Sequence, residues 1–192
     1  MKALVTYESI FGNTAVIARA IADGLRADFD VTVADVRTMP VIGDIDLLVV
    51  GAPTHAFSPS RPRTRAHATR KEATEARTAG VGVHAYLNYA PWLPGVHAAA
   101  FDTSMKMPSL PGSAARMADR RLRVLGCHMA GAPESFHVAA MSGPLVDGEP
   151  ERAYRWARTL AEAVLTARRP TLLGLATVGS PGGPSPHEAA RA

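Results

Sequence analysis

The chain has 192 residues, 47% of them hydrophobic and 20% charged, which is typical of a globular protein with one well-buried core. No apolar run approaches the ~20 residues of a membrane-spanning helix, and the N-terminus lacks a signal-peptide pattern, so we expect a cytoplasmic protein without membrane contact. The single cysteine, Cys127, cannot form an internal disulfide, and we expect it to be buried rather than nucleophilic.

The chain begins with an apolar strand, residues 3–5, that runs into a loop of small polar residues. A helix is predicted to open at Asn13 or Thr14, because the apolar residues after them fall on one face. The free N–H groups of a first helical turn, together with the helix dipole, attract anions. Ser9 and Thr14 can add hydroxyl donors, and Gly12 allows close backbone approach. The sequence therefore predicts a phosphate site without basic residues, unless Ser9 and Asn13 only cap the helix.

Strand and helix signals then alternate along most of the chain. Further strands are predicted over residues 31–36, 46–51, 96–102 and 135–138, and helices over about 64–77, within 82–93, over 113–125 and around 153–164. This alternation predicts an α/β domain, a parallel sheet covered by helices on both faces. We place that domain at residues 1–167 and predict a flexible, Pro/Gly-rich C-terminal tail at 168–192.

Two more loops follow predicted strands. In doubly wound sheets, ligands bind beyond the carboxyl ends of the strands, where the strand order reverses. The loop after the third strand contains the rings of His55 and Phe57, against which a flat heterocycle could lie. The alternative for His55 is a hydrogen bond to the backbone, and the alternative for Phe57 is packing in the core. The residues of these loops are Pro53, Thr54, His55, Ala56 and Phe57, and then Asp102, Thr103 and Ser104.

The run Tyr7-x-Ser9-x-x-Gly12-x-Thr14-x-x-x-Ala18-x-x-Ile21 resembles the flavodoxin signature, which binds the phosphate of FMN. The nucleotide P-loop and the dinucleotide fingerprint are both absent. The resemblance extends over about residues 1–165, and it looks like a flavodoxin-like subgroup common in high-GC bacteria. It implies the flavodoxin-like fold, a doubly wound five-stranded parallel sheet in the order 2-1-3-4-5 with helices on both faces, and non-covalently bound FMN.

The same resemblance assigns the residues around the cofactor. The phosphate loop corresponds to Ser9, Phe11, Gly12, Asn13 and Thr14. The first ring-binding loop corresponds to residues 53–57, and the second to residues 102–104. The Trp and Tyr that usually stack on the flavin are missing from these loops, so we expect a higher reduction potential or weaker FMN binding than in a typical flavodoxin.

The charge also differs from that of flavodoxins, which are usually strongly acidic. This chain has a formal net charge of +4 and an isoelectric point near 9.6. Residues 61–77 carry six basic and two acidic side chains, an excess equal to the whole net charge. We expect this run, close to the flavin rim, to attract an acidic redox protein or the phosphates of NAD(P)H, unless it is only a solvated helix face. No aromatic residue interleaves it, so nucleic acid is not an expected partner.

The sequence thus predicts an FMN-binding, flavodoxin-like redox protein that carries electrons between protein partners. Two alternatives stay open. One is an NAD(P)H-dependent quinone or FMN reductase of the same fold. The other is a degenerate, flavin-free interaction module, which the bulky Phe11 and the absence of the stacking Tyr would suit. A signalling receiver domain is excluded, since the third strand ends in Gly51-Ala52-Pro53 rather than in an acceptor Asp. No metal-ligand spacing or Gly-x-Ser-x-Gly elbow occurs, so no metal and no catalytic residue are predicted.

Overall fold

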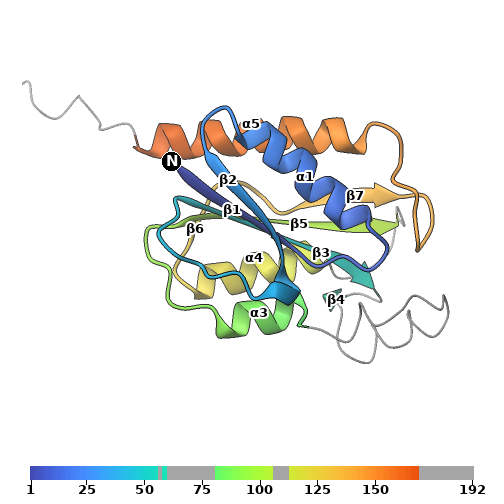
Figure 1. The fold of residues 1–192 in the computed structure, drawn as a ribbon, viewed down its shortest axis with the longest axis horizontal. Helices are drawn as coiled ribbons and strands as arrows, with labels where there is room; N and C mark the ends of the chain where they lie inside the picture. The colour runs from blue at the N-terminus through green and yellow to red at the C-terminus, as the bar shows by residue number, and fades with distance from the viewer. Residues whose placement is uncertain (56–57, 60–80, 106–112, 169–192) are drawn as a thin grey trace, which may run out of the picture.

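A parallel sheet lies between two layers of helices (Figure 1). The structure is a computed structural model, and it describes residues 1–55, 58–59, 81–105 and 113–168. The strands are β1 (Lys2–Tyr7), β2 (Asp30–Asp35), β3 (Leu47–His55), β4 (Ser58–Pro59), β5 (His97–Met105), β6 (His128–Met129) and β7 (Glu134–Val138). The helices are α1 (Asn13–Leu25), α3 (Val83–Tyr89), α4 (Ala114–Val124), α5 (Glu149–Arg168) and the short 3-10 helix η1 (Val36–Thr38).

The sheet has the predicted strand order. The path runs β2-β1-β3-β5, and both β6 and β7 pair with β5 in parallel. β6 pairs with the first residues of β5 and β7 with its last ones, so the two strands share one position in the sheet. The predicted fifth strand, residues 135–138, is β7, and β6 was not predicted. β4 is antiparallel to β3. The predicted order 2-1-3-4-5, with helices on both faces, is confirmed.

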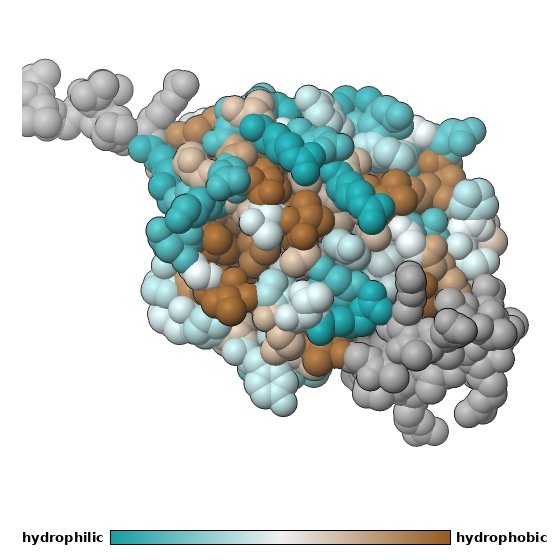
Figure 2. Space-filling model, viewed as in Figure 1, coloured by the Kyte–Doolittle hydropathy of each residue, from teal (hydrophilic) through white to brown (hydrophobic). Residues whose placement is uncertain are grey.

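Each face of the sheet carries its own hydrophobic core. Side chains alternate along a strand, so Val49 of β3 packs toward α1 and α5, whereas Leu48 and Val50 pack toward α3 and α4. Because both faces are covered, the central strands are continuously apolar, as parallel strands between helices should be. Hydrophobic residues reach the surface mainly at the β2 edge in the view of Figure 2, where Val31 and Val33 are only partly buried.

Most predicted helices are present, with small differences at their ends. α5 begins at Glu149 and extends through Arg168, whose guanidinium Nη2 lies 2.5 Å from Oδ1 of Asp46 at the start of β3. The helix predicted over 64–77 and residues 169–192 of the predicted tail lie outside the described residues. No helix in the described part of the chain is long and apolar enough to cross a membrane.

Cys127 is buried, as expected. Burial raises the pKa of its thiol to about 11. A thiol with that pKa is almost entirely protonated near neutral pH, and the protonated form is a poor nucleophile. The prediction of a structural rather than reactive cysteine is therefore supported by its environment.

Candidate functional site

The loop between β1 and α1 turns through a left-handed residue. Gly12 has φ 89° and ψ −20° and is the N-cap of α1, where its carbonyl oxygen accepts the Val16 N–H at 3.1 Å. A Cβ at Gly12 would meet no heavy atom within 4 Å, so glycine is needed here for the backbone conformation and not for packing. The open space beside Gly12 leaves the first turn of α1 accessible from the loop.

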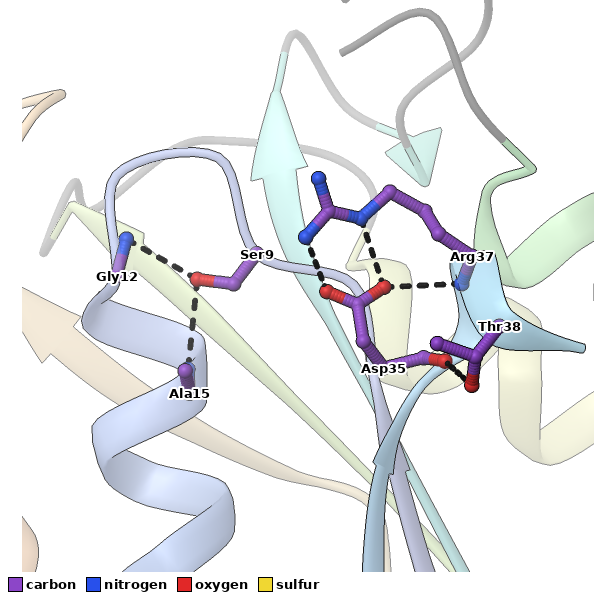
Figure 3. A network of polar contacts seen from close by, with 6 residues as sticks. All are labelled: Ser9, Gly12, Ala15, Asp35, Arg37 and Thr38. Carbon is purple, nitrogen blue, oxygen red and sulfur yellow. Dashed lines mark hydrogen bonds and ion pairs between the residues drawn. The ribbon is translucent and has the colours of Figure 1, made fainter. Parts of the chain in front are cut away.

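The Ser9 hydroxyl caps part of this first turn. Its oxygen accepts the N–H of Gly12 at 3.1 Å and that of Ala15 at 3.4 Å (Figure 3). The N–H groups of Asn13 and Thr14 have no acceptor among the described residues. Ser9 therefore caps two N–H groups, as one interpretation of the sequence expected. The two N–H groups between them have no partner in the described part of the chain, and the predicted phosphate site stays a prediction. The Ser9 hydroxyl proton can still donate outward, because its oxygen is used as an acceptor.

The side chains of Asn13 and Thr14 tie α1 to its neighbours. The Thr14 and Thr103 hydroxyl oxygens lie 2.8 Å apart, and their residues are only 2% and 5% exposed. Asn13 Nδ2 donates to the Ser142 carbonyl at 3.0 Å, and a Cβ at Gly143 would lie 2.8 Å from the Asn13 amide. The start of α1 is thereby fixed against the end of β5 and against the segment after β7.

The three predicted loops leave the sheet at one edge. Tyr7 of β1 is in register with Gly51 of β3, and Pro53 of β3 with Thr103 of β5. The phosphate loop and the two ring-binding loops therefore start from neighbouring strands at their carboxyl ends, as the sequence predicted. His55 is the last residue of β3, and Ser104 lies near the end of β5 and is partly exposed. Ala56 and Phe57 lie outside the described residues.

Asp102 and Thr54 are directed toward α4. Asp102 is fully buried, and its Oδ2 accepts hydrogen bonds from the Thr54 hydroxyl at 2.8 Å, the Ser113 hydroxyl at 2.6 Å and the Ala115 N–H at 3.0 Å. The Thr54 oxygen in turn accepts the Ala114 N–H at 3.0 Å. These side chains hold the N-terminus of α4, where a negative charge is favourable. Because the Thr54 hydroxyl is used in these hydrogen bonds, a ligand at this edge would contact the main chain of Thr54.

Glu8 is a buried residue of this region that was not among the predicted site residues. It is 3% exposed, although it lies in the loop that was predicted to be lined by neutral donors. Its Oε2 accepts the Val83 N–H at 3.0 Å, and its own N–H donates to the Gly51 carbonyl at 2.9 Å. Glu8 therefore holds the start of α3 against the β1–α1 loop. The sequence did contain a sign of this role, because Glu8 is an acidic residue that comes directly after an apolar strand.

A basic residue, Arg37, lies near this region in η1, which follows β2. The Arg37 guanidinium is bound by Asp35, with Nε 2.9 Å from Oδ1 (Figure 3). That hydrogen bond raises the pKa of Arg37, and Glu8 contributes to the same shift through its charge. Tyr7 and Asp35 are in register, so the ion pair of Asp35 and Arg37 lies close to the loop. Because Asp35 neutralises Arg37, this pair adds no net positive charge to the loop.

No protein-family model matches the chain, and no curated protein matches its sequence. Solved structures do match. A flavodoxin from the domain Archaea is 21% identical, with 86% of this chain and 99% of that chain covered and a TM-score of 0.58. Flavodoxin 2 from Bacillus cereus is 20% identical over 84% of this chain and 99% of that chain, with a TM-score of 0.63. Flavodoxin 1 from Bacillus cereus is 17% identical over 84% and 98%, with a TM-score of 0.62. The chain has the flavodoxin-like fold. At these identities, the likeness establishes the fold alone.

Proposed function

We propose that this protein binds FMN non-covalently at the carboxyl edge of β1, β3 and β5 and acts as a redox protein. The observation that carries the proposal is the first turn of α1, where the N–H groups of Asn13 and Thr14 have no acceptor among the described residues. Solved structures with the same fold include flavodoxins, and this supports FMN as the anion.

The chain fits the phosphate of FMN. The N–H groups of Asn13 and Thr14 and the Ser9 hydroxyl would bind its oxygens, and the helix dipole adds about half a positive charge at this end of α1. The left-handed turn at Gly12 opens the space in front of these donors. Phe11 is the remaining residue of the proposed phosphate loop. The contacts of Thr14 with Thr103 and of Asn13 with Ser142 keep the donors in place before the ligand arrives.

The ring-binding assignments are part of the same proposal. Residues 53–57 would lie along one side of the isoalloxazine ring and residues 102–104 along the other. The flavin supplies the electron-transfer chemistry, and the protein supplies its orientation and surroundings. Neither loop has a Trp or Tyr to stack on the ring, so we expect weaker FMN binding or a higher reduction potential than a stacking pair would give.

Within this fold, we propose an electron carrier between protein partners, with an acidic redox protein as the expected partner. An NAD(P)H-dependent quinone or FMN reductase is the enzymatic alternative. The two differ in how the flavin is reduced. Rapid bleaching of the bound flavin by NAD(P)H alone would contradict the carrier, whereas reduction only through an added flavoprotein reductase would support it.

The cofactor proposal is tested by titrating the flavin-free full-length protein with FMN and with riboflavin, which lacks the phosphate. Flavin fluorescence reports binding in both titrations. Since the phosphate contacts consist of several charge-assisted hydrogen bonds, FMN should bind at least about 100-fold more tightly than riboflavin. Equal affinities, or no binding of FMN, would contradict the proposal and favour a flavin-free interaction module.

A further inference from the structure

α3 and α4 lie on the face of the sheet opposite α1 and α5 (Figure 1). Residues of both helices line a groove. It encloses a volume of ≈ 310 Å³. Its floor is formed by Val83, Leu87 and Ala118, which are almost completely buried. Met117 and Val124 lie at its sides. Val124 is an apolar residue, yet it is 64% exposed. The groove therefore offers an apolar surface of a size that can receive two or three side chains.

The polar residues around the groove are basic or neutral. Among the described residues, its polar lining contains no acidic residue and consists of Arg120, Arg121, His84 and Asn88. α4 as a whole has four arginines and one acidic residue, Asp119. Asp119 already accepts a hydrogen bond from Arg123 Nε at 2.9 Å, and neither Arg120 nor Arg121 forms an ion pair within the described residues. The rim thus has positive charge that is not neutralised by the described part of the chain.

Two exposed aromatic residues extend this surface beyond the groove. Tyr89 and Trp92 are 78% and 66% exposed. The Trp92 indole lies over Gly126, where an added Cβ would be 2.8 Å from the ring, and the Leu93 N–H donates to the Leu125 carbonyl at 2.7 Å. Trp92 therefore lies beside the C-terminal end of α4, and Tyr89 is the last residue of α3. Tyr, Trp and Arg are the residues most enriched at the energetic centres of protein interfaces.

The groove also adjoins the candidate flavin site. Its first lining residue, Val83, donates its N–H to Glu8 in the β1–α1 loop. α4 begins at Ala114, beside the end of β3, because Thr54 accepts the Ala114 N–H. The starts of α3 and α4 adjoin this edge, and Val124 lies at the other end of α4, so a protein that covers the whole length of the groove would reach the edge from which the proposed phosphate and ring loops leave.

We infer that the α3–α4 groove docks an acidic amphipathic helix of a protein partner. Apolar side chains of that helix enter the groove over Leu87 and Val124, and its carboxylates face Arg120 and Arg121. That the partner is a redox protein rests on the proposed function, whereas the docking itself does not require flavin. The C-terminal segment 169–192 contains a single acidic residue, Glu188, so its charge does not match this rim.

The experiment uses the full-length protein and a fluorescein-labelled helical peptide with leucines at i, i+4 and i+7 and glutamates flanking that stripe. A second peptide of the same composition has its leucines spread around the helix. Fluorescence anisotropy measures both. The protein should bind the first peptide at least about tenfold more tightly than the second, and the binding should weaken as salt is raised, since rim charges are screened.

Two pairs of variants locate the binding. Arg120→Glu should weaken the first peptide about tenfold, whereas Arg116→Glu, the same charge change at an exposed α4 position outside the groove lining, should weaken it less than about threefold. Val124→Asp should weaken it about tenfold. Its control is Val41→Asp, at a position that is 87% exposed and outside the lining, and this should change the affinity less than about twofold.

Several results would overturn the inference. They are no binding of the first peptide, equal binding of the two peptides, or equal losses for Arg120→Glu and Arg116→Glu. A gain of more than about tenfold from Leu173→Glu in the full chain would show that the C-terminal segment covers the groove instead. FMN absorbance is recorded on the same samples. If the protein binds FMN but not the peptide, only the docking inference is refuted. If it binds the peptide but not FMN, only the cofactor proposal is refuted.

Discussion

The hydroxyl pair of Thr14 and Thr103 offers a quantitative test of how the phosphate loop is held. The two oxygens lie 2.8 Å apart, in residues that are 2% and 5% exposed. Replacing either threonine by valine keeps the shape of the side chain but leaves the other hydroxyl buried without its partner. An unsatisfied buried hydroxyl costs about 1–3 kcal/mol, whereas removing both partners of such a bond is nearly neutral.

We therefore expect each single variant, Thr14→Val and Thr103→Val, to lower the free energy of unfolding by about 1–3 kcal/mol. The double variant should lose less than about 1 kcal/mol. Urea unfolding followed by circular dichroism measures all four proteins of the cycle, with the m-value checked for constancy. In thermal unfolding, each kcal/mol corresponds to a change in Tm of about 2–4 °C for a domain of this size.

The matched control is Thr32→Val, an exposed threonine on β2, which should change stability by less than about 0.5 kcal/mol. The reasoning is refuted if the double variant loses the sum of the two single losses. Additivity would mean that the hydroxyls do not interact, and that the start of α1 is positioned against β5 by other contacts.

Three further variants or groups test other parts of the structure. Gly12→Ala places a Cβ at φ 89° in open space, so it should cost about 1–2 kcal/mol from backbone strain alone, and an unchanged urea midpoint would contradict that. Cys127, with a thiol pKa of about 11, should react with iodoacetamide at pH 7.5 roughly 100-fold more slowly than an exposed thiol until the protein is unfolded; an equal rate would contradict its burial. Burial opposes the charge of Glu149, but hydrogen bonds from Arg152 and the His137 N–H outweigh it and lower its pKa from the ordinary 4.5. Its folded-state pKa lies below the unfolded one, so its stabilising contribution is present above about pH 4.5 and is lost as the pH falls through the lowered pKa. Glu149→Gln should therefore lower stability at pH 7 and flatten the acid dependence measured by urea unfolding, and an unchanged slope would contradict this.

Much of the fold was predictable because it depends on local patterns. The continuous apolar run of β3 and the one-sided apolar faces of α1 and α5 follow from burial in a layered α/β structure. The strand order came from the resemblance of the Tyr7 to Ile21 segment to a known signature. β6 was not predicted, because two residues are too few to show a strand pattern, although Gly131 and Pro133 mark the break before β7.

The site was predictable only in part, because its polar contacts join residues far apart in the sequence. Ser9 caps the helix on which it was also expected to bind phosphate, and a local motif is enough to suggest both roles. Thr54, Asp102 and Ser113 meet only when β3, β5 and α4 are packed together. The burial of Glu8 depends in the same way on α3, which no local pattern places against the first loop.

The most direct test of the account is the response of two backbone amides to ligand. In a heteronuclear NMR spectrum of the ¹⁵N-labelled protein, the amide protons of Asn13 and Thr14 should shift strongly downfield on addition of FMN, because they would then donate to phosphate oxygens. Riboflavin should leave these two resonances nearly unchanged. If FMN binds and the Asn13 and Thr14 amides do not move, the phosphate lies elsewhere and the first turn of α1 is only a capped helix end.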